Sequence, residues 1–145
     1  MKRDPSLLAL SREHHTALSL AIRLKKTVQS GDPLRIEEAR DNVVVRFAAE
    51  LEPHFAEEER TLLPRLATLG EVALVDRTLD EHRSLRALVR KLADPAATHA
   101  AGAFLAEFGD LLTAHVRFEE RELFERAQVL YAEHGATPKV SDAPV

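Results

Sequence analysis

The sequence predicts an all-α protein, folded as an up-down-up-down bundle of four helices. Alanine, leucine, glutamate and arginine dominate the 145 residues, whereas glycine and β-branched runs are scarce, and this composition favours helices. Glycine and proline divide the chain into four long segments in which apolar residues recur at intervals of three and four, the period of a helix face. Because the links between segments are short, consecutive helices are expected to run antiparallel.

Local sequence signals predict the boundary between the first two helices. The first segment carries apolar residues from Leu7 to Val28 and is expected to end at Gly31, a residue suited to the left-handed conformation that follows many helices. Asp32 is then expected to cap the second helix, with Pro33 at its first position.

The other segments follow from the same signals. The second runs over about residues 34–66 and contains Pro53, which removes a backbone hydrogen bond and predicts a kink. The third follows Gly70 and closes at Pro95, and the fourth covers about residues 97–133. Residues 1–132 are therefore assigned to one bundle domain. Residues 133–145, with two prolines and no periodicity, are expected to form a flexible C-terminal tail.

Composition restricts the kinds of function. Because the chain has no cysteine, any metal must be held by nitrogen and oxygen, which suits iron, manganese or zinc. The net charge of −4, with both signs interleaved, provides no basic face for nucleic acid. No apolar run approaches the roughly 20 residues of a membrane span, and the charged N-terminal sequence is no signal core. We therefore expect a soluble, cytoplasmic protein that binds neither nucleic acid nor membrane.

A histidine followed four residues later by a glutamate occurs twice, as His54 with Glu58 and as His115 with Glu119. Residues i and i+4 lie on the same face of a helix, so each pair offers an imidazole and a carboxylate to one point. The same spacing also produces plain surface ion pairs that contribute only a few tenths of a kcal/mol. The positions of the remaining histidines therefore decide whether the motif indicates a metal site or a surface ion pair.

Two further histidines complete a repeated arrangement. His14 and His82 each follow a glutamate, and each lies one helix upstream of a His-x-x-x-Glu pair. Counted from the turns, the ligand positions differ by roughly 6 to 10 Å along the bundle, at about 1.5 Å per residue. All four helices can thus deliver a ligand to one level. The apolar stripe of the first helix favours His14, while His15 is the alternative, because a leucine follows it three residues later, as one follows His82.

These motifs resemble the hemerythrin-like (HHE cation-binding) domain over about residues 11–132. The resemblance implies a four-helix bundle that holds two non-haem irons joined by an oxo or hydroxo bridge. It also implies that histidines terminate each iron and that two carboxylates bridge the pair. Carried onto this chain, the terminal ligands are His14, His54, His82 and His115, and the bridges are Glu58 and Glu119.

Two positions depart from the oxygen-carrying hemerythrins. Those proteins have a second histidine four residues after the third-helix ligand, where this chain has Arg86. They also take the last carboxylate five residues after the fourth-helix histidine, which would select Glu120. We prefer Glu119, because it repeats the spacing of Glu58 and because relatives with one third-helix histidine use that spacing. Those relatives include the iron-centre repair proteins and the iron-sensing F-box domain. The candidate metal ligands are thus His14, His15, His54, Glu58, His82, His115, Glu119 and Glu120.

The resemblance implies a non-haem di-iron protein that binds or senses oxygen, nitric oxide, iron or redox state, with a small diatomic molecule as its expected ligand. The smaller number of histidines argues against reversible oxygen carriage. One alternative is a di-iron oxidase or peroxidase-type enzyme, although ferritin-like enzymes use Glu-x-x-His pairs and this chain has the reverse order. Another alternative is a metal-free helical interaction module. Whether the protein is an enzyme, and which protein partners it has, stays open at this point.

Overall fold

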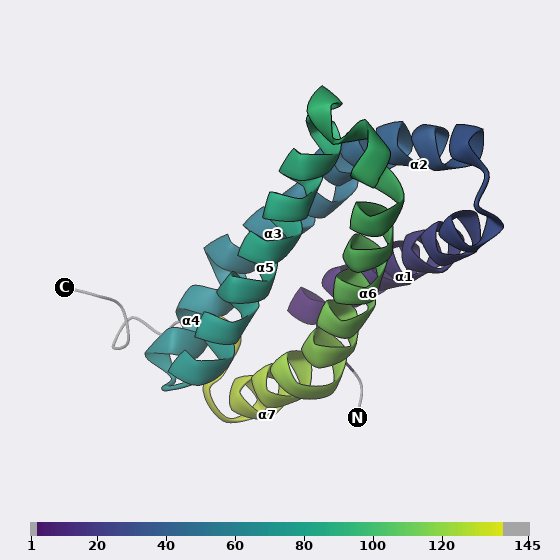
Figure 1. Cartoon of the computed structure of the whole chain (residues 1–145). Helices are drawn as coiled ribbons and strands as arrows, with labels where there is room; N and C mark the ends of the chain where they lie inside the picture. The colour runs from purple at the N-terminus through teal and green to yellow at the C-terminus, as the bar shows by residue number, and fades with distance from the viewer. Residues whose placement is uncertain (1–2, 138–145) are drawn as a thin grey trace.

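The computed structural model describes residues 3–137, which form helices joined by short turns (Figure 1). Four helical runs pack together, each antiparallel to the next, and the predicted all-α bundle is thereby confirmed. None of the helices in the described residues has an apolar stretch long enough to cross a bilayer. The first and third runs are single helices, α1 (Pro5–Ser30) and α5 (Val72–Ala93).

The second and fourth runs each combine several helical segments. The second consists of α2 (Pro33–Arg46), the π-helical turn η1 (Phe47–Leu51), α3 (Glu52–Glu57), the π-helical turn η2 (Glu58–Leu62) and α4 (Leu63–Thr68). The fourth consists of the 3₁₀ turn η3 (Pro95–Ala100), α6 (Ala101–Phe118), the π-helical turn η4 (Glu119–Leu123) and α7 (Phe124–His134). Most of the expected tail, residues 138–145, lies outside the described residues.

Capping residues set the starts of the first two runs, and the cap at Asp32 was predicted. Asp4 and Asp32 accept hydrogen bonds from the backbone N–H groups of Ser6 and Leu34, and a proline occupies the first turn of each helix. These carboxylates satisfy backbone donors that have no partner within the helix. α1 ends at Gly31, whose φ of 66° is left-handed and costs glycine least.

The second run stays helical through Pro53 because the helix widens just before it. In η1 the backbone N–H of Glu52 donates to the carbonyl of Phe47, five residues back. A proline ring would clash with the carbonyl four residues before it in a regular α-helix, and a π turn shifts that carbonyl. The turn η2 stands in the same relation to Pro64. The predicted interruption at Pro53 therefore takes the form of a local widening of the helix.

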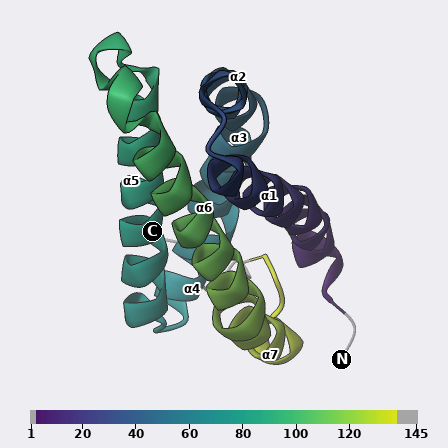
Figure 2. The ribbon, with the colours of Figure 1, turned by 45° about the vertical axis from the view of Figure 1, so that its right-hand side comes forward.

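The buried apolar side chains form two separate clusters. One lies toward the α5–η3 turn and includes Leu92 and Phe108, and the other lies toward the α4–α5 turn and includes Leu66 and Phe124. α6 lies between α1 and α5 and contributes to the first cluster (Figure 2). The layer between the clusters is polar, and it contains His14, His54, Glu58, His82, His115 and Glu119.

Candidate metal centre

Six buried side chains from all four helical runs converge in the polar layer. Their ligand atoms form two groups, within each of which the atoms lie no more than 4.8 Å apart. The two groups share Glu58 and Glu119. The group completed by His14 and His54 is called position A, and the group completed by His82 and His115 is called position B.

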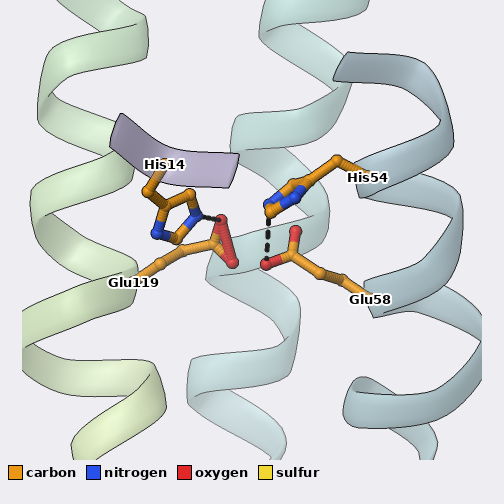
Figure 3. Close-up of side chains that lie close together, drawn as sticks. All are labelled: His14, His54, Glu58 and Glu119. Carbon is orange, nitrogen blue, oxygen red and sulfur yellow. Dashed lines mark ion pairs between the residues drawn. The ribbon is translucent and has the colours of Figure 1, made fainter. Parts of the chain in front are cut away.

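In position A, two histidines from different helices face two carboxylates (Figure 3). Nε2 of His14, on α1, lies 3.4 Å from Oε1 of Glu119. Nε2 of His54, on α3, lies 3.4 Å from Oε2 of Glu58. The four side chains point toward one another, so that their nitrogen and oxygen atoms surround a common point.

Position B repeats this arrangement with the other two histidines. Nε2 of His82 lies 3.1 Å from Oε1 of Glu58, and Nε2 of His115 lies 2.6 Å from Oε1 of Glu119. Glu58 therefore presents Oε2 to position A and Oε1 to position B, and Glu119 Oε1 is close to one histidine of each position. A carboxylate shared in this way has the geometry needed to bridge two cations.

Helical spacing and two π-helical turns aim these carboxylates. Each glutamate lies one turn after its histidine on the same helix, as the spacing predicts. Glu58 is the first residue of η2, and Glu119 is the first residue of η4. In both turns a second glutamate follows, and it reaches a histidine on a neighbouring helix instead of the layer between the clusters.

These second glutamates contact the outward ring nitrogen of a histidine. Glu59 lies 2.6 Å from Nδ1 of His82, and Glu120 lies 3.2 Å from Nδ1 of His14. The hydroxyl of Ser11 also donates to Glu120 at 2.9 Å. An N–H donated from Nδ1 leaves the lone pair on Nε2, which faces the shared carboxylates, so these contacts favour the tautomer that a metal needs.

The glutamates that precede His14 and His82 in the sequence serve the other two histidines. Glu81 lies 2.7 Å from Nδ1 of His115 and forms a hydrogen bond with it. Glu13 lies 3.5 Å from Nδ1 of His54, and this pair does not form a hydrogen bond. Every histidine of the centre thus has a carboxylate from a neighbouring helix beside its outer nitrogen. These four residues, called the outer glutamates below, are Glu13, Glu59, Glu81 and Glu120.

The pKa values of the two shared carboxylates are shifted in opposite directions. Burial, followed by the charge of Glu119, raises the pKa of Glu58 well above its usual range. Burial works against ionisation of Glu119 as well, but the charge of His115 and the close polar contacts with His115 and His14 hold the pKa of Glu119 well below the usual range. In the absence of a cation, two carboxylates this close cannot both ionise freely. The pair therefore favours one proton on Glu58.

The two histidines of position B differ in pKa. It lowers the pKa of His82 to about 4, despite the opposing charge of Glu119. Burial acts in the same sense on His115, but the charge and close contact of Glu119, together with the hydrogen bond that His115 donates to Glu81, outweigh it and raise the pKa of His115 to about 9. His82 therefore offers a neutral imidazole, while a cation must displace a proton from His115.

Phenylalanine rings stack on two of the four histidines, His14 and His82. The ring of Phe55 stacks on His82, with centroids 4.0 Å apart and planes within 12°. The ring of Phe124 stacks on His14 at 5.2 Å and 13°. These contacts limit rotation of the imidazoles and keep their nitrogens directed at the shared carboxylates.

The polar atoms in the layer are suited to metal ions. Nε2 of three histidines, Oε2 of Glu58 and both oxygens of Glu119 are buried without a hydrogen-bond partner within residues 3–137. Buried polar groups are normally paired, because leaving them unpaired is costly. A cation at each position would use these atoms and offset the carboxylate charge. The nitrogen and oxygen set matches iron, manganese or zinc, so the residues present fit a two-metal centre.

The structure places the two members of each alternative pair differently. His15 is exposed on the outer face of α1, whereas its neighbour His14 is buried in position A. Glu120 points to Nδ1 of His14 and belongs to neither group of candidate ligands, whereas Glu119 belongs to both.

Sequence reasoning did not identify the outer contacts of Glu13, Glu59 and Glu81, nor the stacking of Phe55. The repeated Glu-His and Glu-Glu dipeptides were the available signal for the three carboxylates. The pattern alone does not show that each of these glutamates contacts a histidine on another helix.

Comparison with known families agrees with this geometry. The family described as the hemerythrin HHE cation binding domain matches residues 7–127, which contain all six members of positions A and B. No significant match was found among curated proteins or among solved structures. The family match covers most of the chain. The chain therefore belongs to the hemerythrin HHE cation-binding family.

Proposed function

We propose that the protein is a non-haem di-iron protein of the hemerythrin-like class that binds or senses oxygen, nitric oxide, iron or redox state. One iron would be held at position A and one at position B. In this proposal Glu58 and Glu119 bridge the two metals, and one pair of histidines terminates each position. A cytoplasmic location stays a prediction of the sequence.

The observation that carries the proposal is the sharing of two wholly buried carboxylates by four histidines. Glu58 and Glu119 are each 0% exposed, and most of their oxygen atoms lack a hydrogen-bond partner in the described residues. Two such groups in an apolar core would be strongly unfavourable without positive charge. Exposed ion pairs, the simplest alternative for a His-x-x-x-Glu motif, would not bury these atoms.

The chain's own residues would control access and protonation. When bound, iron would supply one-electron chemistry and a place for a small ligand to bind. Phe55 and Phe124 cover the histidines and exclude water from one side of each ring. Glu59, Glu81 and Glu120 hold the tautomers of three of the histidines through hydrogen bonds, which tunes the basicity of the ligating nitrogens.

Metal content tests the proposal directly. Protein reconstituted anaerobically with Fe(II) and freed of excess metal should retain two irons per chain, and the oxidised form should absorb in the near-ultraviolet. Glu58→Gln should lose most of this iron, while His99→Ala, which changes an exposed histidine outside the centre, should retain it. One iron or none in the wild type would contradict the di-iron proposal. Turnover of peroxide by the loaded protein would favour the enzymatic alternative.

A further inference from the structure

One outer glutamate differs from the other three. Glu59, Glu81 and Glu120 each form a hydrogen bond with a histidine, and an arginine forms an ion pair with each of them. Glu13 has neither kind of contact. Its side chain is 50% exposed and lies 3.5 Å from His54, and no lysine or arginine within residues 3–137 pairs with it. Glu13 is thus the one outer glutamate that has neither a hydrogen bond with a histidine nor an arginine partner in the described residues.

Glu13 lies at the rim of a cavity that leads to position A. The cavity has a volume of about 290 Å³, and residues of α1, of the η1–α3 segment and of α6 line it. His14, His54 and His115 are among the residues that line it. The other carboxylate in its lining, Glu50, pairs with Arg46 at 3.0 Å. Glu13 therefore supplies the unneutralised negative charge of this opening.

A second and independent feature of the cavity is the state of His54. The side chain is 4% exposed, yet neither ring nitrogen forms a hydrogen bond within the described residues. Nδ1 faces Glu13 at 3.5 Å, and Nε2 faces Glu58 at 3.4 Å. The imidazole thus connects a half-exposed carboxylate to a buried one. A cation that meets Glu13 has its next ligand within a few ångströms.

Another cavity touches the centre but lacks these features. It is lined by Glu81 and His115 of position B, among others. There Glu81 accepts from His115 and pairs with Arg77 at 2.9 Å. Glu81 is neutralised and the outer nitrogen of His115 is occupied, so neither of these two groups of the centre is free to meet an entering cation. Asp76 and Asp80 also line this cavity, and Asp80 pairs with Arg83, but in the described part of the chain neither aspartate contacts a histidine of the centre. Glu81 is also the repeat equivalent of Glu13, since each directly precedes a histidine of the centre.

We propose that Glu13 is the entry carboxylate of the metal centre: it captures a divalent cation at the mouth of the α1–α3 cavity and passes it to His54 in position A. His115 of position B lines the same cavity, so both positions would be filled from this opening. This inference rests on the proposed metal centre, but it concerns the route of loading. A carboxylate that acts at the mouth raises the local concentration of cations and the rate of capture, and it leaves the final number of bound ions unchanged.

Stopped-flow uptake of Co(II), followed by its visible absorption, tests the route in metal-free protein. At low ionic strength Glu13→Gln should take up Co(II) about 10-fold more slowly than the wild type, with two ions per chain bound at saturation in both. The difference should narrow at high salt, because a half-exposed charge is screened. The matched variant Glu81→Gln should take up Co(II) at the wild-type rate and release it faster.

Each contrary outcome has a distinct meaning. Wild-type uptake rates in Glu13→Gln would overturn the entry role, and so would slower uptake in Glu81→Gln than in Glu13→Gln. A smaller final amount of Co(II) in Glu13→Gln would make Glu13 a positioning residue and would also overturn the inference. Failure of the wild-type protein to bind Co(II) at equilibrium would instead contradict the proposed metal centre. Glu13→Gln conserves size on an exposed face of α1, so its melting temperature should match that of the wild type.

Discussion

The guanidinium of Arg86 lies 2.8 Å from the carboxylate of Glu59, which in turn lies 2.6 Å from Nδ1 of His82. Arg86 also pairs with Glu52 at 2.7 Å and lies over the ring of Phe55. Oxygen-carrying hemerythrins have a histidine at this position. In this chain the residue cannot ligate a metal, since a guanidinium has no lone pair to donate, but it anchors the carboxylate beside a candidate ligand.

Replacing Arg86 should therefore weaken metal binding at position B. We expect Arg86→Gln to raise the dissociation constant at this position about 10-fold, the lower end of the range for partners of metal ligands. Arg86→Lys should fall between this variant and the wild type, because an ammonium cannot hold two carboxylates as a planar fork does. Competition with a chelator measures the effect. Arg83→Gln, on the exposed face of the same helix, is the control, and equal affinity in all variants would contradict the anchoring role.

The adjacent pair Glu119 and Glu120 separates a shared ligand from an outer partner. Glu119→Gln should abolish most metal binding, because it removes an anionic oxygen from both positions. Glu120→Gln should retain two metals and weaken binding by about 10-fold to 100-fold, since His14 is the one candidate ligand that Glu120 contacts. Metal content after gel filtration and a chelator titration measure the two effects. Metal loss in Glu120→Gln with retention in Glu119→Gln would support the five-residue spacing instead.

The adjacent pair His14 and His15 offers a second matched comparison. His14→Ala should lose the metal at position A and keep the metal at position B, giving about one ion per chain. His15→Ala should behave as the wild type, because the side chain is exposed and outside the candidate ligand groups. Both variants can be assayed for metal content and melting temperature. Loss of metal from His15→Ala with an intact fold would reverse this assignment.

The metal-free protein should become less stable between pH 7 and pH 9. The pKa of His115 is raised to about 9, because Glu119 and Glu81 outweigh the effect of burial. The stabilisation is thus present below the unfolded pKa of about 6.5 and is lost as the pH rises through 9. The pKa of His82 is lowered to about 4, so its contribution is lost as the pH falls toward that value.

Thermal melts at constant ionic strength, with a chelator present, should therefore show a maximum melting temperature near neutral pH. The metal-loaded protein should show no decrease toward pH 9, because metal binding competes with protons and strengthens as the pH rises. A melting temperature of the metal-free protein that increases steadily from pH 7 to pH 9 would contradict the ionic role of His115.

The bundle and most of its boundaries could be predicted because they depend on local signals. The period of the apolar residues indicated four helices, and Gly31 and Asp32 marked a turn by conformational preference and capping. The spacing of four residues places His54 and Glu58 on one face of their helix without the help of any tertiary contact. Such features involve residues within a few positions of one another.

The features that could not be predicted depend on contacts between helices. Glu59 directly follows Glu58 in the sequence, and the π-helical turn η2 directs it to His82 on α5. Periodicity at 3.6 residues does not indicate such a turn, and η4 forms without a proline in the turn that follows it. Whether Glu119 or Glu120 faces the candidate ligands likewise depends on a π-helical turn, here η4. It depends on rotation about the helix axis, which a widened turn changes.

The polar layer between the two apolar clusters also affects how long the folded chain survives. The candidate ligands span residues 14–119, so bound metal would close loops that include most of the chain and would link both halves of the core. Without metal, each cluster must hold its half of the bundle across a layer of unpaired polar atoms, which favours partial opening and proteolysis. In a cell, the amount of this protein would then follow the supply of metal.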